Sequence, residues 1–140
     1  MTVHSDIPAV RAKIRAAVSR AMLDCVEAIH EEATSLILDG EKTGRVYRRR
    51  GVEHQASAPG ESPSSDTDRL VQSGHTEVRN EPSAVIGSVS WSTAYADSLE
   101  HGTESMEPRP FARPALATKR QEILKVLATA IIMDVAAKRW

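Results

Sequence analysis

The sequence predicts an α+β fold in which a small antiparallel sheet packs against long N- and C-terminal helices, with a long flexible loop between them. Apolar residues recur at spacings of three and four near both ends of the chain, which indicates two long helices. Near the middle, short runs of strand-forming residues flank a turn, which indicates a hairpin. The 140 residues suit one domain, 1–140.

The composition predicts a thin core. Apolar residues make up 41% of the chain, but aromatic residues make up only 4%, and Phe111 is the only phenylalanine. Aromatic side chains supply the largest buried area per residue, so a core without them must be aliphatic. We therefore expect part of the surface of the long helices to be buried only against other subunits.

The first helix is expected within residues 1–39. Asp6 is a suitable N-cap, Pro8 follows it in the first turn, and Asp39-Gly40 ends the pattern. About 30 residues span on the order of 45 Å, so we expect this helix to protrude or to pack against a neighbour. One apolar stripe follows its length: Val10, Ile14, Val18, Met22, Cys25, Ile29, Ala33 and Leu36.

Charged residues on the opposite side of this helix change sign along its length. They are basic from Arg11 to Arg20 and mainly acidic from Asp24 to Glu32. This order is opposite to the preference of the helix macrodipole. Either the charges serve contacts with other molecules, or the face is merely solvated, and a solvated face is the commoner case.

Residues 44–91 are expected to supply the strands. Glycines bound a candidate strand at 44–51. Further strands are expected at 76–79 and 84–91, joined by a turn at 80–83 whose Asn, Pro and Ser are typical turn residues. The last two strands therefore form the predicted hairpin.

The flexible loop is expected at residues 56–68, which are rich in Ser, Pro, Gly and acidic residues. At about 13 residues it is longer than most loops inside a domain, and such loops tend to be functional or disordered. A short helix is expected at 68–72, directly after the loop.

The C-terminal part is expected to be helical. A short helix at 94–100 should end at Gly102, which suits a left-handed cap. The C-terminal helix is expected within 110–140, with an apolar side made of Leu116, Ile123, Leu127, Ala130, Ile131 and Val135. Three prolines bracket Phe111 and make the lead into this helix rigid: Pro108, Pro110 and Pro114.

The sequence predicts no catalytic residue, metal or cofactor, and hence no enzyme. Cys25 is the only cysteine, so neither an internal disulfide nor a cysteine cluster for zinc can form. The five histidines lack metal-binding spacings, and the sequence has no Gly-x-Ser-x-Gly elbow or phosphate-binding loop. No stretch approaches the roughly 20 apolar residues of a membrane span, so we expect no membrane contact.

The strongest local charge is an arginine run around Tyr47, made of Arg45, Arg48, Arg49 and Arg50. These side chains suit contact with phosphates or with an acidic subunit surface. Alternatively, they protect an edge strand from aggregation, which is the commoner use of such charges. The net charge of −1 argues against a protein that binds nucleic acid through its overall charge.

Several separated segments resemble one known family. Residues 91–103 read WSTAYADSLEHGT, and residues 106–116 read MEPRPFARPAL. In order and spacing, these blocks resemble the gp-ten-like tail-component proteins, the neck and tail-completion proteins of HK-type long-tailed bacteriophages. Upstream segments that also match this pattern are GRVY at 44–47, HQASAPGE at 54–61 and DTDRL at 66–70.

The resemblance implies a structural virion protein at the head–tail junction, assembled in the cytoplasm of a bacterial host. It implies a homo-oligomeric ring, a hexamer in expectation, between a head connector or stopper and a tail terminator or tail-tube protein. DNA would pass transiently through its lumen. A cyclic ring needs heterologous interfaces, which we expect at the first helix, the strand at 45–50 and the loop at 56–68.

The matched blocks supply candidate interface or structural residues: Glu100, Gly102, Arg109, Pro110, Phe111, Arg113 and Pro114. The glycine lets the chain reverse, the phenylalanine anchors the proline segment in the core, and Pro110 and Pro114 preset the last helix. Arg109 and Arg113 can pair with carboxylates such as Glu100 or Glu104, either locally or across subunits. Alternatively, the block only caps a helix.

The chain departs from the family pattern at three positions. His101 stands where an aromatic or apolar residue is usual, Asp68 where glycine is common, and Pro108 where alanine is frequent. These departures affect the expected turns more than the resemblance. The rival function class is a small nucleic-acid-binding or regulatory protein that acts through Arg45–Arg50.

Overall fold

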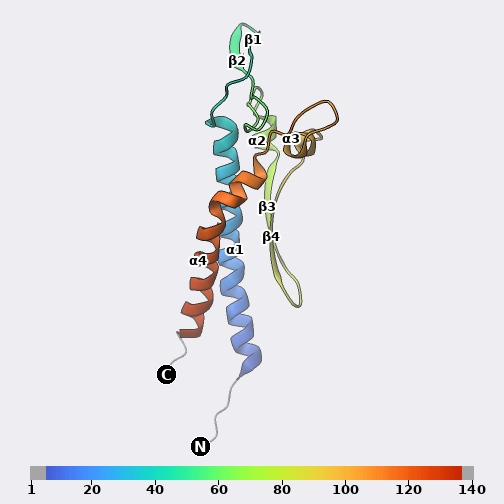
Figure 1. The fold of residues 1–140 in the computed structure, drawn as a ribbon. Helices are drawn as coiled ribbons and strands as arrows, with labels where there is room; N and C mark the ends of the chain where they lie inside the picture. The colour runs from blue at the N-terminus through green and yellow to red at the C-terminus, as the bar shows by residue number, and fades with distance from the viewer. Residues whose placement is uncertain (1–5, 137–140) are drawn as a thin grey trace, which may run out of the picture.

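The computed structural model describes residues 6–136 and has the predicted α+β architecture. Its elements are α1 (Ile7–Leu38), β1 (Val46–Arg49), β2 (Val52–Gln55), α2 (Arg69–Gln72), β3 (Gly74–Asn80), β4 (Val85–Trp91), α3 (Ala96–His101) and α4 (Ala112–Ala136). Figure 1 shows an elongated molecule in which α4 runs back along α1 and the β3–β4 hairpin lies on another side of α1. The β1–β2 hairpin lies beyond the C-terminal end of α1.

Helix α1 begins and ends where its sequence predicts. The side chain of Asp6 accepts a hydrogen bond from the backbone N–H of Ala9 at 3.2 Å, and Pro8 lies in the first turn. At the other end, the N–H of Asp39 donates to the carbonyl of Ser35. The first five residues of the predicted range 1–39 lie outside the described part of the chain.

Small residues let other elements approach α1 closely. The β3–β4 hairpin is antiparallel, and it touches α1 at Gly87. A Cβ atom on Gly87 would lie 2.7 Å from side-chain atoms of both Met22 and Val26, so the approach requires glycine.

Cys25, in the predicted apolar stripe of α1, is buried. Burial raises the pKa of its thiol, and the nearby charges of Asp24 and Glu122 raise it further.

The core lies where α2, α3 and the start of α4 meet the C-terminal half of α1. Its buried apolar residues are Ala33, Ile37, Leu70, Ala96, Phe111 and Ala115. Phe111 and Ile37 are the largest fully buried side chains in the described part of the chain. Trp91 packs against Phe111 edge to face, with ring centroids 4.8 Å apart. The core is therefore small and mainly aliphatic, as the composition predicts.

A strand, β1, lies within the predicted range 44–51, but the chain reverses at the end of that range and the hairpin was not predicted. Arg50 and Gly51 both have positive φ, +53° and +83°, as the tight turn of a two-residue hairpin requires. The chain then returns as β2, so that Val46 pairs with Gln55 and Arg49 with Val52. The described residues thus form two separate two-stranded sheets, and of these two only β3–β4 packs on the long helices.

The predicted apolar side of α4 is only partly correct. Ile123, Leu127 and Ala130 are half-buried, but Leu116, Ile131 and Val135 are 51%, 42% and 51% exposed. Three further aliphatic side chains on this helix are also exposed: Leu124, Ile132 and Met133. Apolar residues therefore surround much of α4, whereas α1 covers only one side of it. Residues 137–140 of the predicted helix lie outside the described range.

Candidate functional site

A buried carboxylate joins α3 to the start of α4. Glu100 is 7% exposed, and one of its carboxylate oxygens accepts hydrogen bonds from the backbone N–H groups of Phe111 and Ala112 at 2.9 and 3.0 Å. The other oxygen accepts from the N–H of Arg113 at 3.0 Å. The first N–H groups of a helix have no partner within it, so a carboxylate here caps α4 from a distant part of the sequence.

Arg113 completes this arrangement, which we call the Glu100 junction (Glu100, Phe111, Ala112 and Arg113). Its Nε donates to the carboxylate at 2.9 Å, and a terminal nitrogen donates to the carbonyl of Glu100 at 2.7 Å. Burial alone would raise the pKa of Glu100, but the three backbone N–H groups and Arg113 together hold that pKa below its usual value. The carboxylate is therefore charged and fully used in capping.

Phe111 and the flanking prolines act as the sequence predicts. Phe111 is 1% exposed and anchors the segment between α3 and α4 in the core. Pro114 lies in the first turn of α4, where a backbone N–H would have no acceptor within the helix, so proline loses no helical hydrogen bond there. Pro110 precedes the helix in the extended lead.

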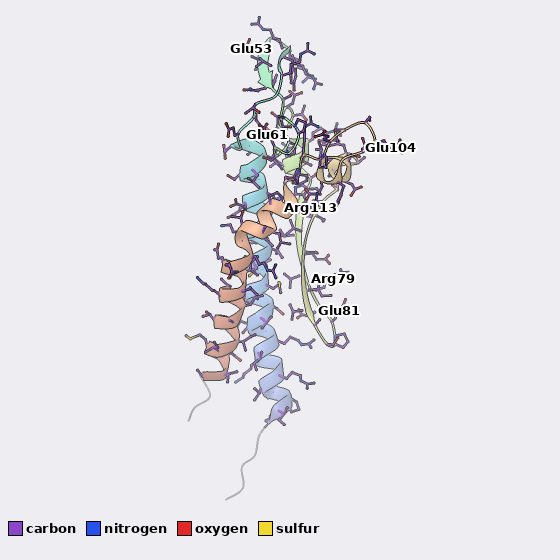
Figure 2. The ribbon with its side chains drawn as sticks, in the orientation of Figure 1. Glu53, Glu61, Arg79, Glu81, Glu104 and Arg113 are labelled. Atoms are coloured by element: carbon purple, nitrogen blue, oxygen red, sulfur yellow. The ribbon has the colours of Figure 1, made fainter. Side chains whose placement is uncertain are left out.

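One predicted detail at this block is wrong, and another does not form among residues 6–136 of the chain. Gly102 has a positive φ of 78°, but its ψ of 179° places it in an extended region that glycine alone adopts readily, not in the left-handed cap. Arg109 makes no ion pair within the described residues. Its Nε instead donates to the carbonyl of Ser57 at 3.3 Å. Glu104, the other predicted partner, lies on the loop that projects from α3 (Figure 2).

The predicted arginines lie together on the β1–β2 hairpin. We define the arginine hairpin as residues 45–55. Tyr47 stacks on His54 with ring centroids 5.6 Å apart, and Arg49 pairs with Asp66 of the loop. Its other arginines are exposed and have no ion pair among residues 6–136: Arg45, Arg48 and Arg50.

Hydrogen bonds that the sequence did not reveal hold residues 56–68 against the body. The carboxylate of Glu61 accepts from the backbone N–H groups of Thr43 and Ala58, and Figure 2 shows Glu61 near the end of α1. Lys42 donates to the last-turn carbonyl of Leu36 and to Ser62, both at 3.0 Å. The segment forms no helix or strand, as predicted, and its contacts make it part of the fold.

The titratable side chains at this site are occupied by structural contacts. Glu100, the one deeply buried carboxylate among residues 6–136, already accepts four N–H bonds, so it offers no free oxygen to a substrate. Over residues 6–136, no group of three or more His, Cys, Asp or Glu side chains is placed to hold a metal ion. No helix within that range is long and apolar enough to cross a membrane.

No protein-family model, curated protein or solved structure shows a significant match to this chain.

Proposed function

We propose that this chain is a structural subunit of a tailed phage, a prophage or a gene-transfer particle, and that it joins the head to the tail in the neck. In this proposal it acts through shape and surface, without catalysis or a cofactor. Its copies form a ring, a hexamer in our proposal, between a head connector or stopper and a tail terminator or tail-tube protein.

The observation that carries this proposal is the large surface that the chain leaves unburied. Its accessible surface is 9817 Å². A compact monomer of the same mass, 15.3 kDa, would expose about 7,100 Å². This surface includes exposed aliphatic side chains of the long helices, for example at Ile7, Ile132 and Met133. Such surfaces are typical of subunits that bury them against neighbours.

The contacts between distant segments also support the resemblance to neck proteins. The segments that carry it are far apart in sequence, yet they touch in the fold. Gly60 donates its N–H to the carbonyl of Pro108 at 3.0 Å, and Arg109 reaches Ser57. A second link runs from the N–H of Gly44 to the carbonyl of Ala56 at 3.0 Å. The motifs therefore describe one connected unit around the Glu100 junction.

Deletion of the gene in a bacterium that produces the particle tests this proposal. Electron microscopy of the lysate should show filled heads and complete tails that are not joined. Expression of the wild-type chain from a plasmid should restore joined particles. Joined, infectious particles formed in the absence of the chain would contradict the neck function.

A second candidate function is binding of nucleic acid, favoured by the three exposed, unpaired arginines of the arginine hairpin. Such binding would weaken as salt rises, because contacts with phosphates release counterions. Substitution of Arg48 and Arg50 by alanine would then remove binding to duplex DNA in a fluorescence anisotropy titration. If the wild-type and substituted chains show the same weak binding, this candidate is excluded.

A further inference from the structure

One side of α1 carries three exposed acidic residues that make no ion pair within residues 6–136. Asp24, Glu27 and Glu31 are spaced by three and four residues, so they lie on one side of the helix. Leu23, one turn before Glu27, is exposed beside them. We call these four residues the acidic face.

The acidic face carries a cost that a solvated helix could avoid. Glu27 and Glu31 are four residues apart, and like charges at this spacing destabilise a helix. Two other charged residues of α1 do make contacts within the molecule. Arg15 donates to the carbonyl of Pro82 at 2.6 Å, and Glu32 pairs with Lys119 of α4. The acidic face has no such partner among residues 6–136.

The arginine hairpin has the complementary composition. It carries four arginines against a single acidic residue, Glu53, and all four side chains of β1 are exposed. Val52 is exposed on the same face of the hairpin as Tyr47, and Val46 is exposed on the other face. Each surface thus combines exposed apolar side chains with charge, and the two charges are of opposite sign. This combination favours a specific contact between them.

The hairpin cannot reach the acidic face of its own chain. Figure 1 shows β1–β2 beyond the C-terminal end of α1, pointing away from the helix, and Glu53 lies at its outer end in Figure 2. Glu27 is 11 residues before Leu38, about 16 Å along the helix at 1.5 Å per residue. Only a second molecule can therefore bring these two surfaces together.

We propose that the arginine hairpin of one copy docks on the acidic face of the next copy. This inference rests on the proposed neck function and names the contact that builds its ring. The interface is heterologous, because each copy contacts one neighbour through its arginine hairpin and the other neighbour through its acidic face. The same contact therefore repeats from copy to copy until the ring closes.

The positions of the two surfaces also set the orientation of the subunits. Docking displaces each copy along the α1 direction of its neighbour, because the hairpin is at one end of the helix and the acidic face is nearer its centre. A displacement along the axis of a ring would give an open helix instead of a closed ring. In the ring, α1 therefore lies around the circumference and not along the channel.

Charge exchange tests this contact in the purified chain by sedimentation velocity at low and high salt. The wild type should associate at low salt and dissociate as salt rises. Two variants should each associate on the order of tenfold more weakly or less: Arg48→Glu with Arg50→Glu, and Glu27→Arg with Glu31→Arg. Arg120→Glu with Lys125→Glu, on exposed positions of α4, is the matched control and should associate like the wild type.

Mixing the two variants gives the decisive result. Each has lost its own complementary pair, but the basic hairpin of one fits the acidic face of the other, and the acidic hairpin fits the basic face. The mixture should therefore associate although neither variant does so alone. The chain that carries all four substitutions should also associate. Circular dichroism of every variant checks that the fold is kept.

The docking contact is overturned if the wild type stays monomeric at low salt, if the variants associate as strongly as the wild type, or if mixing restores nothing. Particles that contain either variant separate this inference from the function. Normal necks built from a variant would exclude the contact and leave the neck function standing. Joined particles without the chain would exclude the neck function, whatever the purified chain does.

Discussion

The buried carboxylate of Glu100 is stable in its charged form because the nearby N–H donors point toward it. Moving a carboxylate out of water is unfavourable unless hydrogen bonds and an opposite charge replace its hydration. Here the replacement comes from three N–H groups at the start of α4, where the helix macrodipole is positive, and from Arg113. One side chain thereby fixes the angle at which the last helix leaves α3.

Removal of this carboxylate should destabilise the chain strongly. Glu100→Ala leaves three N–H groups and a guanidinium without their acceptor, so we expect the free energy of unfolding to fall by about 3 kcal/mol. Urea denaturation followed by circular dichroism measures the loss. Glu104→Ala, at an exposed position on the loop after α3, is the control and should cost less than about 0.5 kcal/mol. Equal stability of the two variants would contradict the capping role.

The same carboxylate should make stability depend on pH in the acid range. Because its pKa in the folded chain lies below the usual value, its contribution is complete above the unfolded pKa of about 4.3. The contribution is lost as the pH falls through the lower, folded pKa. The difference in unfolding free energy between wild type and Glu100→Gln should therefore be constant above about pH 5.5 and shrink below pH 4.3 or so. A difference that grows on acidification would contradict this sign.

The sequence indicated the unusual backbone conformation of Asp68 only in part. It has a φ of +54°, in the left-handed region that glycine adopts most easily. The neck-protein pattern has glycine at this place, so the departure at Asp68 did mark an unusual turn. Its carboxylate accepts a hydrogen bond from the hydroxyl of Ser65, which offsets part of the backbone strain.

At the scale of elements, the features predicted correctly are those with a local or periodic signal in the sequence. The cap at Asp6, the stripe along α1 and the turn between β3 and β4 are local signals, and each is confirmed. The β1–β2 hairpin was missed because a glycine at the end of a strand and a glycine in a tight turn look alike. Gly51 was interpreted as the end of the strand, whereas its positive φ makes it part of the turn.

Contacts between distant polar residues have no comparable signal. Glu61 and Lys42 lie in segments without period, and their partners became visible only when the chain folded. Arg113 was expected to pair with Glu100 or Glu104 because they lie in one block of the sequence, and the pair with Glu100 is the one that forms. The exposed side of α4 could not be assigned, since apolar residues at several angles around a helix do not show which of them faces a neighbour.

The arginine hairpin should be removable without loss of the fold. The N–H of Ala56 donates to the carbonyl of Arg45 at 3.0 Å, so two glycines in place of residues 46–55 can join the same ends. The lost pair between Arg49 and Asp66 is partly exposed and contributes little. The thermal midpoint, measured by circular dichroism, should change by less than about 5 °C.

The control deletion removes the β3–β4 hairpin, residues 74–91, which packs on α1 and contributes Trp91 to the core region. That variant should not fold. If shortening of the arginine hairpin also abolishes cooperative unfolding, the hairpin is part of the stable body, and its role as a separate docking element is excluded.

At the scale of the whole molecule, stability and assembly draw on the same surfaces. The core contains few large side chains, and aliphatic residues of α4 such as Leu124 and Ile132 remain in contact with water. Burial of apolar area is the main favourable contribution to folding. A single copy of this chain therefore lacks part of the stabilisation that its sequence could supply, and neighbouring copies can provide it.

This coupling predicts that the thermal midpoint rises with protein concentration. A folded chain that binds further folded copies is stabilised by mass action, while the unfolded chain is not. Scanning calorimetry between roughly 2 and 200 µM at low salt should show a steady rise for the wild type. The Arg48→Glu with Arg50→Glu variant should show a much smaller rise, because it keeps its aliphatic surfaces but has lost the attraction that aligns the copies. A wild-type midpoint that is independent of concentration would mean that the exposed aliphatic surfaces contribute nothing between copies of this chain.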